Sequence, residues 1–152
     1  MNQQNSNGSF QILSINISSE KGVQKVPVDH AVLEEDHGIV GDAHAGPWHR
    51  QVSLLSDEDV DTMRNKGATI RYGAFAENIT TKGAPIGELP LGTVLQIGIA
   101  ELVITQRGKE CHHGCEIFKI VGDCVMPRRG VFARVIRGGE ISRESECHYR
   151  VG

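Results

Sequence analysis

Residues 105–131 concentrate the side chains that could bind a soft metal or attack an electrophile. This stretch, TQRGKECHHGCEIFKIVGDCVMPRRGV, contains three of the four cysteines, two adjacent histidines and several basic side chains. Thiolates and imidazoles are preferred ligands of zinc and other soft metals, and a thiolate is also a strong nucleophile. We therefore expect the chemistry of this chain to depend on this segment.

Zinc binding is one chemistry that the segment allows. Cys111 and Cys115 are separated by three residues that include His112 and His113. A structural zinc site usually combines two ligand pairs. The distant candidates for a second pair are Cys124, Cys147 and His148.

Redox exchange and simple burial are two further interpretations of the cysteines. Redox thiol pairs usually have Cys-x-x-Cys spacing, which the chain lacks. A free cysteine can also be a small buried hydrophobic residue. The apolar surroundings of Cys124 suit burial, whereas the polar and cationic neighbours of Cys111 and Cys115 suit it less well.

A reactive thiolate beside an anion-binding loop is the fourth interpretation. Lys109, His112 and His113 would favour ionisation of a neighbouring thiol. Arg128 and Arg129 follow Pro127 and could hold a phosphate. A thiolate and a basic loop together suggest a phosphate-bearing ligand that carries sulfur or metal.

The rest of the chain predicts short strands that would position this segment. Residues 56–66 predict a helix, because Ser56 is a good N-cap and three acidic residues follow it. The apolar phase shifts near Gly98, which predicts a hairpin of 93–97 and 100–106. Residues 33–47 predict a polar loop. Further extended segments are expected at 10–18, 26–28, 50–55, 72–81, 130–136 and around Ile141.

These elements predict a mainly β fold. About seven or eight short strands with glycine-rich connections favour a closed or nearly closed β-barrel, because closure protects the strand edges. With 152 residues the chain fits one domain, which we place at residues 10–152 after a disordered tail at 1–9.

Composition excludes several classes of protein. The net charge of −3 predicts no nucleic-acid partner, and no apolar run approaches the ~20 residues that cross a bilayer. The first residues lack the features of a signal peptide, so a cytoplasmic location is expected.

The stretch GKECHHGCEIFKIVGDCVMPRRGVFARVIRGGEI resembles the MOSC domain, named for the C-terminal domain of molybdenum cofactor sulfurases. It is most similar to short, stand-alone bacterial members. HGIVGDAHAGPWHRQVSLL, FAENITTKG and LPLGTVLQIG resemble further family signatures, in the expected order. The resemblance covers roughly residues 10–142. It implies a β-barrel related to the inserted barrel of pyruvate kinase, and a role in handling sulfur or the molybdenum cofactor.

The resemblance also implies roles for individual residues. By motif position, Cys115 matches the family's persulfide carrier or molybdenum ligand, and Cys111 and His112 are further candidate metal ligands. His44 and His112 are candidate proton-transfer or ligand groups. The other matched positions, expected to bind the cofactor, are Asp42, His44, Arg50, Glu77, Asn78, Arg128 and Arg134. Arg129 stands where the family more often has an acidic residue.

The implied ligand or substrate is the molybdenum cofactor. The implied partner is a cysteine desulfurase, a molybdoenzyme or a cofactor-biosynthesis protein. The chain carries no aminotransferase-like desulfurase domain, so no pyridoxal phosphate site is expected. One alternative is a non-catalytic module that delivers molybdopterin and needs the basic loop but no reactive thiol.

Overall fold

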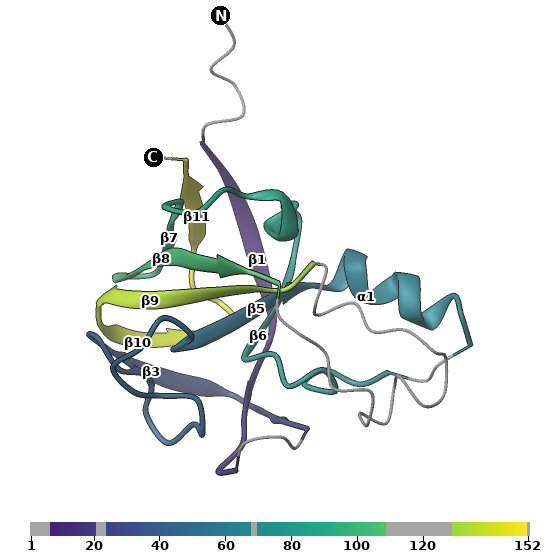
Figure 1. Cartoon of the computed structure of the whole chain (residues 1–152), viewed down its shortest axis with the longest axis horizontal. Helices are drawn as coiled ribbons and strands as arrows, with labels where there is room; N and C mark the ends of the chain where they lie inside the picture. Colours follow the sequence, from purple (N-terminus) through teal and green to yellow (C-terminus); the bar gives the residue numbers. More distant parts are fainter. Residues whose placement is uncertain (1–6, 21–23, 68–69, 109–128, 152) are drawn as a thin grey trace, which may run out of the picture.

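The computed structural model describes residues 7–20, 24–67, 70–108 and 129–151 (Figure 1). Strands dominate these residues, with one short α-helix and one 3₁₀ helix among them. In chain order the elements are β1 (Asn7–Ile17), β2 (Val26–Val28), β3 (His30–Glu34), β4 (Gly38–Ile39), β5 (Val52–Ser56), α1 (Asp57–Arg64), β6 (Ile79–Lys82), η1 (Ile86–Glu88), β7 (Val94–Ile97), β8 (Ala100–Arg107), β9 (Val131–Arg137), β10 (Gly139–Ser142) and β11 (Cys147–Arg150).

Seven of these strands form a closed barrel, which confirms the predicted fold. Their order is β11-β7-β8-β9-β5-β6-β1, and a pairing of β1 with β11 closes the ring. Asn7 pairs with Arg150 and Phe10 with Cys147 at this closure. Strands β5 and β6 run parallel, and the other neighbours in the ring run antiparallel. The barrel is therefore mixed, and β2 extends it as a partner of β1.

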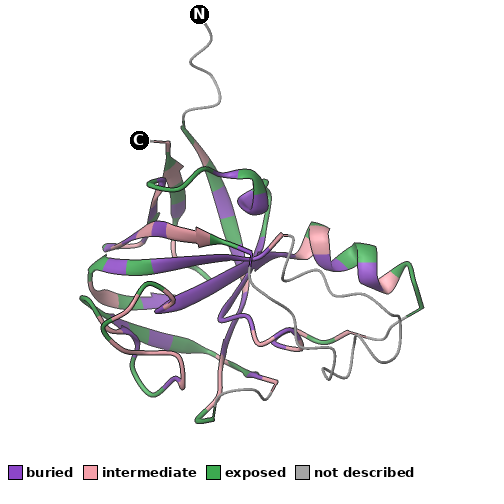
Figure 2. Cartoon of the chain, in the orientation of Figure 1, coloured by how far each residue is buried: buried purple, intermediate pink, exposed green. Residues whose placement is uncertain are grey.

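A small second sheet packs beside the barrel. Its order is β10-β3-β4. Leu33 of β3 and Ile141 of β10 are 1% exposed and belong to the same hydrophobic cluster as the barrel interior. The second sheet therefore extends the barrel's core and is no separate unit (Figure 2).

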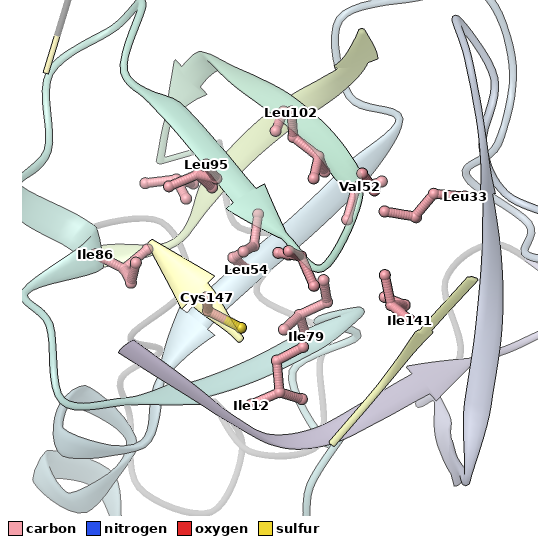
Figure 3. Packing of buried hydrophobic residues seen from close by; sticks show 14 of the residues in the cluster. Ile12, Leu33, Val52, Leu54, Ile79, Ile86, Leu95, Leu102, Ile141 and Cys147 are labelled. Atoms are coloured by element: carbon pink, nitrogen blue, oxygen red, sulfur yellow. The ribbon is translucent and has the colours of Figure 1, made fainter. Parts of the chain in front are cut away.

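The barrel interior is filled by apolar side chains from most of the strands (Figure 3). Along β8 buried and partly buried residues alternate, as expected for a strand with one face inward. All five residues of β5 are buried, because this strand is covered on both faces. On its outer side, α1 packs close to β5 and β6 and buries Val60 and Met63.

The predicted helix and hairpin are both present. The Ser56 hydroxyl accepts a 3.2 Å hydrogen bond from the Asp59 N–H, which caps the start of α1. Strands β7 and β8 pair across a turn in which Gly98 has φ of +59°. The turn brings Leu95 and Leu102 to the same inner face, which explains the phase shift in the sequence.

Four expectations differ from the structure. Residues 7–9, predicted as part of a tail, belong to β1. Residues 72–78, predicted as extended, form turns, and β6 begins only at Ile79. Within the predicted loop 33–47, a short hairpin joins β3 to β4. The described residues hold eleven strands, more than the seven or eight expected, and β11 was not predicted.

Candidate functional site

The predicted site residues fall into two groups. Cys111, His112, Cys115 and Arg128, together with Cys124, lie outside the described residues, within 109–128. The described group consists of Asp42, His44, Arg50, Glu77, Asn78 and Arg134. The geometry of the site is therefore built from this second group and from the residues on either side of 109–128.

The residues that flank 109–128, called the cysteine segment below, are attached to the same place on the barrel. The Gly108 N–H donates a 2.7 Å hydrogen bond to the Gly130 carbonyl, which joins the end of β8 to the start of β9. Arg107 donates a 3.1 Å hydrogen bond to the Gly87 carbonyl of η1. The Cα of Gly87 packs so tightly against the Arg129 backbone that an added Cβ would lie 2.6 Å from its carbonyl oxygen. The helix η1 therefore contacts both attachment points.

Arg129 forms ion pairs within the protein. Its Nε is 3.0 Å from Oδ1 of Asp59 on α1, and its Nη2 is 3.3 Å from Oε2 of Glu88 on η1. The departure from the family pattern at this position therefore links two elements of the fold. This arrangement differs from the phosphate binding that the sequence suggests for Arg129.

Arg50 lies beside the end of β8. Its Nε donates a 3.1 Å hydrogen bond to Oε1 of Gln106, and its guanidinium carbon is 5.2 Å from the centroid of the Phe132 ring. Gln106 in turn donates a 2.8 Å hydrogen bond to the Gly108 carbonyl. Among the described residues no carboxylate pairs with Arg50. Its positive charge is therefore available to an anion near the point where the cysteine segment leaves the barrel.

A β-bulge sets the position of Gln106. The register of β8 against β9 shifts between Ile104 and Gln106, so Thr105 is the extra residue. The Thr105 hydroxyl donates to the carbonyl of His49, next to Arg50. Bulges often redirect side chains beside functional sites. The bulge here joins the loop that carries Arg50 to the edge of β8.

Arg134 is paired with a carboxylate. Its Nη2 is 2.5 Å from Oδ1 of Asp36, and the same oxygen accepts a 3.0 Å hydrogen bond from Gln51. The hydrogen bond from Arg134 lowers the pKa of Asp36, and Gln51 adds to this effect. The predicted phosphate ligand Arg134 therefore already has an anionic partner, whereas Arg50 has none in the described structure.

Asp42 and His44 belong to a buried polar cluster with Lys25. The Lys25 ammonium is 2.8 Å from Oδ1 of Asp42 and 3.0 Å from Nδ1 of His44. Both the Lys25 and the Asp42 side chains are fully buried, while 22% of the His44 side chain is exposed. Burial by itself would raise the pKa of Asp42, but the hydrogen bond and charge of Lys25 outweigh it and lower the pKa.

Glu77 accepts hydrogen bonds from the turn that precedes β6. Its carboxylate accepts from the backbone N–H groups of Gly73 and Phe75, at 2.9 and 3.1 Å, and from the Thr80 hydroxyl at 2.7 Å. The residue is 1% exposed. Burial raises the pKa of Glu77 against the opposing effect of these donors. In the described structure Glu77 is thus bound to the protein's own groups.

Asn78 joins three strands. Its Oδ1 accepts a 2.9 Å hydrogen bond from the Ser53 N–H of β5, and its Nδ2 donates a 3.1 Å hydrogen bond to the Asn16 carbonyl of β1. Asn78 directly precedes β6 and is fully buried. The signature residues Glu77 and Asn78 therefore hold the start of β6 in place.

The structure connects Glu77 to the cluster of Asp42 and His44. The Gly73 N–H donates a hydrogen bond to the Glu77 carboxylate. The Gly73 carbonyl in turn accepts a 2.9 Å hydrogen bond from the Lys25 N–H. Lys25 is thus the link between two signatures that are distant in sequence. Neither Lys25 nor Gln106 was predicted, because a single lysine beside a short strand and a single glutamine in a hairpin carry no motif.

Cys147 is a buried free thiol. It is 3% exposed, its Sγ–H points to the Ser145 carbonyl at 3.4 Å, and burial raises its pKa to about 12. The next residue, His148, has a side chain that is 57% exposed, as alternation along β11 requires. Cys147 and His148 therefore face opposite sides of the strand, and they cannot serve together as the second ligand pair of a zinc site.

Among the residues that the structure describes, no group of three or more His, Cys, Asp or Glu side chains has the geometry to hold a metal ion. None of the helices in that part of the chain is long and apolar enough to cross a membrane.

Solved structures with the same fold cover nearly all of this chain. The YUAD protein from Bacillus subtilis is 17% identical, with a TM-score of 0.81 over 96% of this chain and 98% of its own. YiiM from Geobacillus stearothermophilus is 20% identical, with a TM-score of 0.66 over 92% and 74%. YiiM from Escherichia coli is 18% identical, with a TM-score of 0.68 over 93% and 69%. These TM-scores show that the fold is shared.

Comparison with curated proteins finds no match. The family model for the MOSC domain matches residues 41–147, well over half of the chain. The match includes the signatures around Asp42 and Asn78 as well as the cysteine segment. The chain therefore belongs to the MOSC domain family.

Proposed function

We propose that this protein handles sulfur or the molybdenum cofactor, with Cys115 as the reactive residue. Cys115 would carry sulfane sulfur as a persulfide or would bind molybdenum as a thiolate. Membership of the MOSC family supports this assignment. The cofactor would be a ligand or substrate that brings the metal and a phosphate group to the site.

The position of Arg50 is the observation that favours a phosphate-bearing ligand. Its guanidinium is fixed by Gln106, which also binds Gly108 at the end of the cysteine segment. A guanidinium binds phosphate oxygens through charge-assisted hydrogen bonds when no other anion neutralises it. In the described structure Arg50 meets this condition, and Arg134 and Arg129 do not. We assign the phosphate contact to Arg50, with Arg128 as a second contact from the basic pair.

The described residues fit such a ligand in two further respects. The side chain of His44 is 22% exposed, and the Trp48 ring lies parallel to it with ring centroids 6.5 Å apart. Glu77 and Asn78 would support the site through the backbone they hold. Lys25 would support it through its contacts with Asp42 and His44. This assignment leaves Arg50 and Arg128 as contact residues and Glu77 and Asn78 as supporting residues.

The test is a comparison of the wild-type protein with Cys115→Ser. After incubation with a cysteine desulfurase and cysteine, intact-protein and peptide mass spectrometry should show one added sulfur atom on Cys115. Molybdenum content should be measured on the same proteins purified from a molybdenum-replete host. Wild-type protein should show the persulfide or bound molybdenum, and Cys115→Ser should lose it. A variant that retains both would remove Cys115 from the assignment.

A non-catalytic delivery module remains the second candidate function. It is favoured by the same position of Arg50, because holding a phosphate group requires no thiol. In that case Cys115→Ser would bind the cofactor as tightly as the wild type, and Arg50→Met would not. The proposed partner is a cysteine desulfurase that would supply the sulfur, or a molybdoenzyme or cofactor-biosynthesis protein that would receive the ligand.

A further inference from the structure

Gln106 holds the guanidinium of Arg50 with an uncharged amide. Its Oε1 accepts a 3.1 Å hydrogen bond from Nε of Arg50. Elsewhere in the described structure, carboxylates hold the guanidinium groups of Arg134, which pairs with Asp36, and of Arg129, which forms two ion pairs. A carboxylate neutralises the cation that it holds, whereas an amide does not. Arg50 is therefore held in place without loss of its net charge.

The contacts of Gln106 allow its amide only one orientation. An arginine side chain has donors and no acceptor, so the amide oxygen must face Nε of Arg50. A backbone carbonyl only accepts, so the amide nitrogen must face the Gly108 carbonyl, to which it donates at 2.8 Å. The Gly108 N–H is itself bound to the Gly130 carbonyl at 2.7 Å. A flipped amide would lose both contacts, so Gln106 is a fixed support for Arg50.

Phe132 supports the same guanidinium from a second direction. Gln106 and Phe132 are direct partners in the pairing of β8 with β9. The guanidinium carbon of Arg50 lies over the Phe132 ring, 5.2 Å from its centroid, and Phe132 is 4% exposed. The Thr105 hydroxyl donates to the carbonyl of His49, which holds the backbone next to Arg50. The arginine is thus held beside its backbone, at Nε and over an aromatic ring.

The Nη groups of Arg50 are the donors that these contacts do not use. Among the residues that the structure describes, Arg50 makes no further hydrogen bond and no ion pair. The N–H groups that Gln106 does not receive are on Nη1 and Nη2. Such a fork of donors matches two oxygen atoms of a phosphate or another oxyanion. The arrangement therefore suits an anion that presents two oxygen atoms side by side.

We propose that Gln106 is a positioning residue that keeps Arg50 both oriented and charged, so that the Nη groups of Arg50 select an oxyanion. The identity of that oxyanion as the phosphate group of the ligand rests on the proposed function. A carboxylate in place of the amide would also hold Arg50, but it would neutralise the guanidinium as Asp36 neutralises that of Arg134. The amide thus determines whether the site binds anions.

Titration of the full chain with inorganic phosphate tests the anion site. In ¹H–¹⁵N spectra of labelled protein, the Nε–H signal of Arg50 is identified by its loss in Arg50→Met. We expect phosphate to shift this signal along a saturable curve, which gives the affinity of the site. A signal that phosphate leaves unmoved would overturn both the assignment of the phosphate contact to Arg50 and the role of Gln106.

Two substitutions separate charge from position. Gln106→Glu should weaken phosphate binding about tenfold or more, because the carboxylate pairs with Arg50 and competes with the anion. Gln106→Met should weaken it only about threefold, because the guanidinium stays charged but must be ordered by the ligand. A merely structural role predicts that Gln106→Met, which removes both hydrogen bonds, weakens binding at least as much as Gln106→Glu. That order, or affinity losses that simply follow stability losses in urea unfolding, would contradict the proposal.

Gln96 provides the matched control. It is exposed on β7, and its Nε2 donates to the carbonyl of Gly98, two residues along the chain, as Gln106 does to Gly108. Gln96→Glu makes the same change of charge and should alter phosphate affinity by less than about twofold. Equal losses for Gln96→Glu and Gln106→Glu would assign the effect to net charge and overturn the proposal. If Gln106→Met does not fold, Gln106→Glu measured against this control still decides the question.

This result is independent of the chemistry of Cys115, because persulfide formation is measured separately by mass spectrometry. Phosphate binding that depends on Gln106 in a protein that forms no persulfide would support the role of Gln106 and contradict the sulfur chemistry. Persulfide formation in a protein whose phosphate affinity is unchanged by both Gln106 variants would support the sulfur chemistry and overturn the role of Gln106.

Discussion

The Nε of Arg50 and Oε1 of Gln106 are 3.1 Å apart, although the two residues are separated by 56 positions in sequence. Gln106 also binds the carbonyl of Gly108, so one amide side chain connects the 40–51 loop to the start of the cysteine segment. This contact places the guanidinium of Arg50 at the start of the cysteine segment. Among the described residues, Arg50 has no carboxylate partner.

Arg50→Met should therefore reduce ligand binding more than Arg134→Met. The loss of one charge-assisted contact corresponds to about tenfold in affinity or more. Arg134 should matter less, because Asp36 already neutralises it. Molybdenum and phosphate bound per chain after purification would be compared, with exposed Arg143→Met as the control. Equal losses for the Arg50 and Arg134 variants would contradict the assignment.

Glu77→Gln should destabilise the fold by roughly 1–3 kcal/mol in urea unfolding, because an amide offers one acceptor oxygen where two oxygens receive three donors. The folded-state pKa of Glu77 is raised above 4.5. Burial thus favours the protonated form of Glu77 in the folded wild-type protein. The stability that this form contributes is complete below pH 4.5 and is lost as pH rises through the folded-state pKa, whereas the glutamine in the variant does not titrate. The difference in unfolding free energy between the two proteins should therefore narrow with rising pH. Exposed Glu35→Gln should show neither effect.

Asp42→Asn should show the opposite pH dependence. Removing the partner of a buried ammonium costs about 3–5 kcal/mol. The pKa of Asp42 is lowered from 3.8 in the folded protein, so the stability that its carboxylate contributes is complete above pH 3.8 and lost as pH falls toward the folded-state pKa. Chemical unfolding of both proteins across this range should show their stabilities converging at low pH. A constant difference would argue against the ion pair.

Cys147 should resist alkylation in the folded protein. Its pKa of about 12 leaves almost no thiolate near neutral pH, and its side chain is buried. Peptide mass spectrometry after brief treatment with iodoacetamide should find Cys147 unmodified in buffer and modified in urea. Rapid labelling in buffer would show that β11 opens readily from the barrel.

Gly87→Ala tests the contact between η1 and the attachment points of the cysteine segment. Its Cβ would lie 2.6 Å from the Arg129 carbonyl oxygen, so the two segments must separate, at a cost of about 1–3 kcal/mol. Persulfide formation on Cys115 should slow. Gly41→Ala is the matched control. A Cβ at Gly41 would meet no atom within 4 Å, so this variant has only the strain of placing an alanine at a φ of +90°. Equal effects of both variants on persulfide formation would remove η1 from the argument.

Local sequence signals were enough to predict several elements of the fold. Ser56 and the acidic residues after it define a helix start in any protein, and the change of apolar phase at Gly98 requires a turn. Strand β11 was missed because CHYR is short and has one fully buried residue, Cys147. Its strand conformation depends on pairing with β1 and β7, which a local pattern does not contain.

The candidate site was less predictable because it depends on pairings between distant residues. The family signatures marked Asp42 and Glu77, but the buried lysine between them belongs to no signature. Arg134 and Arg50 look equivalent in sequence. They differ because Asp36, in a turn where its φ is +52°, pairs with Arg134 and not with Arg50.

The pairing of β1 with β11 has a consequence for folding during synthesis. Strand β1 is synthesised well before β11, one of its two barrel neighbours, so this edge of β1 stays unpaired until residues 147–150 leave the ribosome. Contacts of such wide sequence separation slow folding, and exposed strand edges promote association between chains. Removal of residues 147–150 should therefore produce an open, aggregation-prone sheet, even though these residues lie outside the cysteine segment.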